Sequence, residues 1–452
     1  MDIDYVQRIV RSLDPSVPPS YDSSAPAGPP GYTSRRAMTE HQYTLASRGN
    51  KPPWATLKLL SRSPNPSQLP TILEGDRLVG AVVLNLDKSD GIVGVSVVAK
   101  GQVVPGPDDR DPLTFLELTT TLWSKDRGDP RNPTTPTRKL TGHYEWPFSL
   151  EIPASVVLDQ GTFRLPQTFV ERRFPTSVSY VLVLQITRGR FRVNSRIHTS
   201  LHYVPATRPS PPSPLRQLAY RQSTPLIGPE GDPAGWEQLP PFTVRGTAFK
   251  TRTVEATCWF SLAKPLCYTR GSQVPCAITL SCTDTQALDL LSAPRAVNVA
   301  LRRRLRPIPP ASRRTGMFDA NADLSADPAE TVALASWWPP AEGAAAEAAS
   351  ATSHRRLEGE ISLPVTLKPS ARMAHFAVEY SVEVLPFKAI AFIPEHGSHP
   401  PPFVCQPIEI VTMHASGVVP RSYAPPQYSA SQEEAVRDNY FNADGLGHVW
   451  RT

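Results

Sequence analysis

Short apolar segments that alternate with polar residues recur along most of this chain. They are rich in Val, Leu and Thr and are separated by clusters of Gly, Asp and Pro, which is typical of β-strands joined by turns. The first half predicts strands at 54–60, 78–86, 92–104, 114–123, 144–152, 163–171, 179–188 and 191–204. The second half predicts strands at 242–249, 253–263, 274–283, 296–306, 332–338, 357–364, 374–386 and 403–413. Many short strands at this spacing favour a β-sandwich or a barrel.

Changes in composition between these strands suggest where domains begin and end. The predicted fold class is all-β, with two β-sandwich domains in tandem and disordered N- and C-terminal tails. The predicted boundaries are a tail at 1–40, a first sandwich at 41–205, a proline-rich linker or strap at 206–241, a second sandwich at 242–416 and a tail at 417–452. The second sandwich carries a low-complexity insertion at 307–356.

The tetrapeptide Pro-Pro-x-Tyr occurs three times, twice near the N-terminus and once near the C-terminus. Paired prolines hold a short extended left-handed helix, so little entropy is lost when such a segment docks in an aromatic groove, as WW-domain ligands do. Chance occurrence in proline-rich tails is the alternative for any single copy. The predicted WW-domain contacts are Pro18, Pro19, Tyr21, Pro29, Pro30, Tyr32, Pro425, Pro426 and Tyr428.

Composition narrows the classes of partner. The 51 prolines among 452 residues argue against long helices, and the formal net charge of +6 permits contact with anionic lipid, phosphorylated tails or nucleic acid. No zinc-finger spacing, ribonucleoprotein motif or basic-zipper repeat accompanies this charge, so no nucleic-acid partner is expected. Candidate contacts to lipid or phosphate are Arg302, Arg303, Arg304, Arg306, Arg313 and Arg314.

Two groups of residues leave alternatives open. The arginine cluster either meets an anionic membrane surface or a phosphorylated tail, or it is the polar end of a strand that leads into a loop. The segment Trp337-Trp338-Pro339-Pro340 either anchors a ligand or packs in the core with one ring reaching the surface.

The sequence contains none of the common catalytic or metal-binding motifs. It contains no phosphate-binding loop, no Gly-x-Ser-x-Gly elbow, no His-Glu-x-x-His and no dinucleotide fingerprint, so we expect no enzyme and no cofactor. The five cysteines form no Cys-x-x-Cys pair, which suits free thiols in a reducing cytosol and predicts no metal site. The N-terminus is no secretory signal and no apolar run is long enough to span a bilayer.

Several stretches resemble the arrestin family. In the first half these are Leu73-Glu74-Gly75-Asp76 with Gly80, Val83, Leu86, Val95, Val97 and Gly101, then Gly142-His143-Tyr144-Glu145-Trp146-Pro147-Phe148 with Ile152-Pro153, and 178–186. In the second half they are 254–262 and Cys267-Tyr268-Thr269-Arg270-Gly271-Ser272. With the Pro-Pro-x-Tyr motifs, the sequence is similar to the α-arrestins of fungi over roughly 41–415.

The resemblance implies two immunoglobulin-type sandwiches in an adaptor. Such an adaptor connects a WW-domain HECT-type ubiquitin ligase to a membrane transporter or receptor, which is then ubiquitinated, internalised and sorted. It implies a cytoplasmic protein peripherally associated with the plasma membrane or endosomes. The alternative is a trafficking scaffold of the same fold that recruits no ligase and binds cargo tails or anionic lipid.

Overall fold

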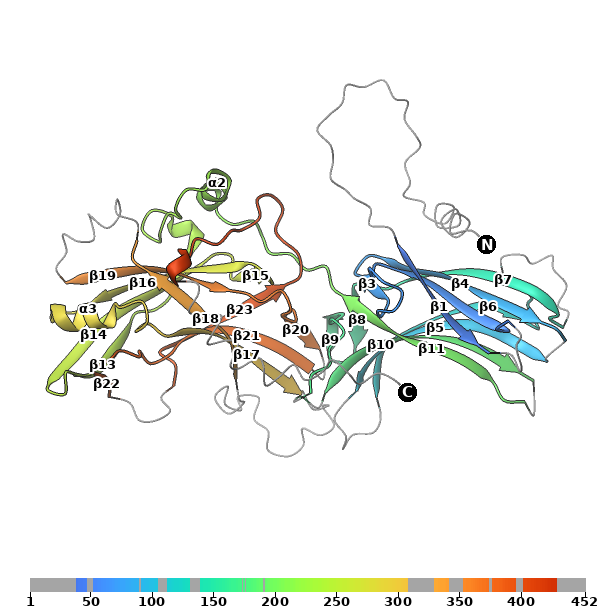
Figure 1. Ribbon diagram of the computed structural model, residues 1–452. Helices are drawn as coiled ribbons and strands as arrows, with labels where there is room; N and C mark the ends of the chain where they lie inside the picture. Colours follow the sequence, from blue (N-terminus) through green and yellow to red (C-terminus); the bar gives the residue numbers. More distant parts are fainter. Residues whose placement is uncertain are drawn as a thin grey trace, which may run out of the picture. The chain divides into compact units, whose positions relative to one another are not determined.

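The chain is mostly β-structure and divides into two compact units, unit 1 at Met1–Pro205 and unit 2 at Ala206–Thr452 (Figure 1). The computed structural model describes residues 38–46, 52–88, 91–104, 112–130, 139–172, 174, 176–189, 192–307, 329–340, 353–373, 376–395 and 401–428. The two N-terminal Pro-Pro-x-Tyr motifs, Arg313 and Arg314 lie outside the described residues. The predicted all-β fold class is confirmed.

Two sheets and a hairpin make up the described part of unit 1. The first sheet has the order β1 (Thr39–Leu45), β2 (Ala55–Ser61), β4 (Arg77–Leu86) and β7 (Gly142–Glu151). The second has the order β3 (Thr71–Leu73), β11 (Ser195–Val204), β10 (Ser177–Arg188), β5 (Ile92–Val104) and β6 (Leu113–Ser124). The hairpin joins β8 (Ser155–Leu158) and β9 (Gly161–Arg164).

Alternation of side chains gives the second sheet of unit 1 one buried face along β10. In β10 every second residue is buried, and these residues are Val178, Tyr180, Leu182, Leu184 and Ile186. Because successive side chains of a strand point to opposite faces, this pattern packs one face of the sheet into the core.

Unit 2 joins its strands differently. In its described part, one sheet has the order β15 (Cys267–Thr269), β23 (Val404–Val411), β21 (Phe376–Val384), β17 (Val299–Pro307), β18 (Glu330–Trp338), β19 (His354–Ser362), β16 (Gln273–Ser281), β14 (Arg252–Ala263), β13 (Phe242–Ala248) and β22 (Phe392–Pro394). The short strand β12 (Trp236–Gln238) pairs with β14, and β20 (Ala371–Met373) pairs with β21. The helices are α2 (Pro214–Gln222) and α3 (Thr285–Leu291), with a 3₁₀ turn η1 (Pro233–Gly235).

The observed elements differ from the predicted ones at identifiable places. The strand predicted at 163–171 is wrong, since β9 ends at Arg164 and Pro166 follows, which cannot donate to a ladder. The carbonyl of Pro166 instead accepts a hydrogen bond of 2.8 Å from the Tyr180 hydroxyl. The region predicted as a linker or strap, 206–241, contains α2, η1 and β12.

Candidate functional site

The third Pro-Pro-x-Tyr motif lies within the described residues, at the end of a segment that we call the C-terminal strap, residues 414–428. Pro426 to Tyr428 form a helical turn, in which the Tyr428 N–H donates to the Pro425 carbonyl at 2.9 Å. The predicted tail from 417 onward therefore has a defined backbone as far as Tyr428.

Glu360 on β19 holds the strap just before the motif. Its side chain lies in the interior, with the residue 3% exposed. The Ser422 hydroxyl donates to Oε1 of this carboxylate, and the Tyr423 N–H donates to Oε2 at 2.9 Å. Burial of a carboxylate is costly unless its oxygens accept hydrogen bonds, so the strap completes the environment of Glu360.

Helix α2 supplies an aromatic surface for the strap. The ring of Tyr220 stacks on the ring of Tyr423, with centroids 6.1 Å apart and planes inclined by 28°. Burial raises the pKa of Tyr220 to about 12 and also raises the pKa of Tyr423, so both phenols stay neutral near pH 7. At the C-terminal end of α2, Arg421 donates to the Ser223 hydroxyl.

The start of α2 explains why a proline-rich segment becomes helical there. Ser213 is the N-cap, its side chain accepts from the Arg216 N–H, and Pro214 occupies the first helical position, where a missing N–H costs nothing. This combination is a recognisable start signal in the sequence.

Arg216 fastens the helix to the body of unit 2. Its guanidinium donates to the carbonyls of Lys264 and Gly235, both at 2.6 Å, and lies 5.0 Å from the centroid of the Trp236 ring. Burial lowers the pKa of Arg216 from its usual value, while the carbonyls and the ring face give the charge compensating contacts.

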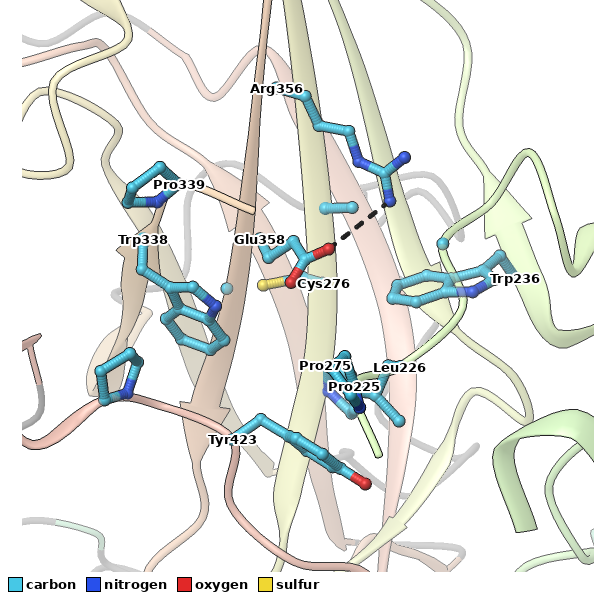
Figure 2. A pocket seen from close by; sticks show the side chains of 14 residues that line it. Pro225, Leu226, Trp236, Pro275, Cys276, Trp338, Pro339, Arg356, Glu358 and Tyr423 are labelled. Atoms are coloured by element: carbon cyan, nitrogen blue, oxygen red, sulfur yellow. Dashed lines mark ion pairs between the residues drawn. The ribbon is translucent and has the colours of Figure 1, made fainter. Parts of the chain in front are cut away.

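A cavity of about 240 Å³ lies beside the strap, and half of the residues that line it are aromatic or proline. Its walls include Trp236, Pro275, Trp338, Pro339, Tyr423 and Pro425. Figure 2 shows the Glu358 carboxylate between the side chains of Trp338 and Trp236, with Arg356 above it. Two strap residues thus form part of the wall, so the strap shapes this cavity.

Glu358 and Arg356 are the charged pair of the cavity. Burial raises the pKa of Glu358, although the Arg356 guanidinium, 3.9 Å away, favours the ionised form (Figure 2). Arg356 also lies 3.7 Å from the exposed Glu230 carboxylate. The cavity therefore offers apolar surface with one compensated carboxylate.

Strand β18 contacts the motif itself. The buried Ser336 hydroxyl donates to the Tyr428 carbonyl at 3.3 Å. The two tryptophans that follow have different surroundings. Trp337 packs in the core, where it is 2% exposed and lies edge-on against Phe260 with ring centroids 6.4 Å apart. Trp338 lines the cavity.

The four described arginines of the predicted cluster lie on β17 and have partners within unit 2. Arg304 contacts Glu383 at 2.6 Å, and the Glu383 side chain is only 3% exposed. The other contacts are Arg302 to the Ala329 carbonyl and Thr331, Arg303 to Glu330, and Arg306 to Glu379. These contacts suit the polar-strand alternative, and binding of lipid or phosphate stays a prediction.

The described cysteines are free thiols. Burial raises the pKa of Cys258 and Cys267 to about 12, which keeps them protonated and weakly nucleophilic near pH 7. In the part of the chain that the structure describes, no group of three or more His, Cys, Asp or Glu side chains could hold a metal ion. No described helix is long and apolar enough to cross a membrane.

Sequence reasoning identified the motif but not the residues that hold it. Glu360, Ser336 and Tyr220 come from three elements distant in the chain, and no local pattern marks them. Tyr423, five residues before the motif tyrosine, was also missed.

A scan of the chain against protein-family models finds no matching family, and a search of curated proteins finds no matching relative. The resemblance to arrestins therefore stays a prediction based on the stretches quoted above.

Proposed function

We propose that this chain is an α-arrestin-like adaptor that recruits a WW-domain HECT-type ubiquitin ligase to membrane transporters or receptors for ubiquitin-dependent endocytosis and sorting. The all-β body supports this proposal because it offers a large folded surface for cargo. The Pro-Pro-x-Tyr motifs near both ends of the sequence supply the ligase contacts.

The repetition of the motif is the observation that carries the proposal. Three copies occur in one chain, with an all-β body between the second and the third. A ligase with several WW domains would engage more than one copy, and linked weak sites gain about 10²–10⁴ in avidity where the linkers span them.

The test is capture of WW-domain ligases from cell extract by the intact chain and by a variant with Tyr21→Ala, Tyr32→Ala and Tyr428→Ala. We expect the ligase with the intact chain only, since the tyrosine ring completes each motif. The matched control carries Ser20→Ala, Gly31→Ala and Gln427→Ala at the variable position of each motif and should capture the ligase normally. Equal capture by the tyrosine variant would show that the motifs are not the ligase contacts.

One observation favours a second candidate function, a trafficking scaffold of the same fold that recruits no ligase. The third motif is folded against unit 2 through Ser336 and the turn at Pro425, so it has a structural role there. If the intact chain captures no ligase, the scaffold is the better proposal. Binding to vesicles that contain anionic lipid, lost on Arg302→Gln and Arg303→Gln, would then support a membrane-surface partner.

A further inference from the structure

The third motif has a backbone that differs from the one a WW domain binds. A polyproline II segment is extended and has no internal hydrogen bonds, and it docks as such in the aromatic groove. Here the Tyr428 N–H is bonded to the Pro425 carbonyl, which closes a turn across the whole motif. A groove that requires the extended form cannot accept the motif until this turn opens.

Contacts on both sides of the turn keep it closed. Before the motif, the Glu360 carboxylate accepts from Ser422 and Tyr423. At its end, the Ser336 hydroxyl donates to the Tyr428 carbonyl. Because the two attachments lie on neighbouring strands, β19 and β18, they fix the strap at two points on one sheet.

We propose that unit 2 masks its own third Pro-Pro-x-Tyr motif, with Glu360 as a latch that holds the strap in a folded turn. The inference rests on the proposed function and adds a regulation to it. The apparent affinity of a WW domain for this motif equals the affinity for the open strap reduced by the fraction of molecules in which the strap is open.

The chemistry of the latch makes it reversible. Ser422 is exposed, yet its hydroxyl donates to a carboxylate that the strap covers. A negative charge at position 422 would face the Glu360 carboxylate and repel it, which opens the strap. Neutralising Glu360 would weaken the two hydrogen bonds, since bonds to a charged acceptor are the stronger ones.

The experiment isolates the third motif in the full chain by Tyr21→Ala and Tyr32→Ala. The probe is a recombinant WW domain that binds Pro-Pro-x-Tyr peptides, titrated calorimetrically against this chain and against a free peptide of residues 420–431. We expect the free peptide to bind about tenfold more tightly or better, because closing the strap competes with binding.

Two further variants in the same background address the latch. Glu360→Gln and Ser422→Glu should each raise the affinity of the chain toward that of the free peptide. Glu255→Gln is the matched control, since Glu255 is a surface carboxylate of unit 2 paired with Arg245 at 3.0 Å, and it should change nothing. Ser422→Glu acts at an exposed position, so it tests the latch even if Glu360→Gln disturbs folding.

The outcomes separate the two proposals. Equal affinity of chain and peptide would overturn masking and leave ligase recruitment standing. Failure of the peptide to bind any WW domain would remove this motif from the proposed function, and masking with it. Tighter binding of the peptide with no response to Glu360→Gln or Ser422→Glu would overturn the role of Glu360.

Discussion

Units 1 and 2 share one scheme of strand pairing despite their different sheet counts. Each antiparallel pair within the two sheets of unit 1, leaving aside the β8–β9 hairpin, has a counterpart in unit 2. In the first sheet, β1–β2, β2–β4 and β4–β7 correspond to β13–β14, β14–β16 and β16–β19. In the second sheet, β5–β6, β10–β5 and β10–β11 correspond to β17–β18, β21–β17 and β21–β23. The similarity includes a parallel pair, β3 with β11 and β15 with β23. The described strands thus repeat one framework.

The turn after the short parallel strand is the closest local match. It contains Gly75 in unit 1 and Gly271 in unit 2, with φ angles of 86° and 79°. Such positive values suit glycine because it has no Cβ. Each turn leads directly into a long strand, β4 in unit 1 and its counterpart β16 in unit 2.

The two units also differ in how their sheets join and in what covers them. In unit 2, β18 also pairs with β19, which links the two halves into one sheet. The equivalent strands of unit 1, β6 and β7, belong to two separate sheets. The C-terminal strap binds β18 and β19 at this junction and stacks on helix α2, whereas the described residues of unit 1 include no helix. The motif lies on the added strap, whereas Glu360 and much of the cavity wall belong to the framework strands β16, β18 and β19.

The largest expected effect comes from a glycine that each unit places under an aromatic ring. A Cβ on Gly80 of β4 would lie 2.6 Å from the Phe148 ring, and a Cβ on Gly359 of β19 would lie 2.5 Å from the Trp337 ring. We expect Gly80→Val and Gly359→Val each to lower the free energy of unfolding of its own unit by about 3 kcal/mol or more, because backbone atoms also block the added groups.

Scanning calorimetry of the full chain checks this prediction. Each variant should shift one unfolding transition and leave the other in place. Gly94→Ala in β5 is the control, since its nearest neighbour would be 3.9 Å from the new methyl group, and it should cause little change. A single transition that both valine variants shift equally would show that the units unfold as one.

The shared framework was largely predictable, and the additions were not. The strand predicted at 92–104 coincides with β5, because Val-rich alternation bounded by turn residues is a local signal. Strand β1 escaped prediction because its sequence, Thr-Glu-His-Gln-Tyr-Thr-Leu, is mostly polar. The strap escaped because Glu360, which stabilises it, lies about sixty residues earlier in the sequence and reveals its role only through folding.

The second prediction concerns the element that unit 2 has added. Arg216→Ala should lower the free energy of unfolding of unit 2 by about 3 kcal/mol, because the half-buried Lys264 carbonyl and the buried Gly235 carbonyl both lose the guanidinium and the Trp236 ring loses the cation that lies over it. The matched control is Arg221→Ala, at an exposed position of the same helix. Calorimetry should show the unit 1 transition unchanged, and an equal loss in the control would contradict the role of Arg216.

The third prediction distinguishes the units by pH. His41 on β1 is buried; its Nε2 lies 2.8 Å from the Ser61 hydroxyl and its Nδ1 lies 3.1 Å from the Pro66 carbonyl. Burial lowers the pKa of His41 below its ordinary value of 6.5. At a pH between the folded and the unfolded pKa of His41, the unfolded chain binds the proton and the folded chain does not. The stability contributed by neutral His41 is therefore fully present above pH 6.5 and is lost as the pH falls through the folded pKa.

Thermal unfolding between pH 7.5 and 5 measures this effect, and the unit 1 transition should fall with pH more steeply than the same transition in a His41→Gln variant. His143→Gln serves as the control because His143 is exposed and bonded to Asn85 at 2.7 Å. An unchanged pH profile in His41→Gln would show that other groups set the acid sensitivity of unit 1.

The smallest effect sharpens the comparison at the matched turns. Asp76 accepts from the Arg62 guanidinium at 2.6 and 2.7 Å and from the Leu73 N–H at 3.1 Å, whereas Ser272 donates to the Thr269 carbonyl at 2.6 Å and is buried. We expect Asp76→Ala and Ser272→Ala each to lower the free energy of unfolding by about 1 kcal/mol.

The loss from Asp76→Ala should shrink in 1 M salt because the Arg62 side chain is 41% exposed and its ion pair is screened, while the loss from Ser272→Ala should not change. Denaturant unfolding at two salt concentrations gives both values. An identical salt response at the two turns would mean that the ion pair adds nothing to the shared geometry, and that the glycine and the parallel strand alone set the stability of this turn in both units.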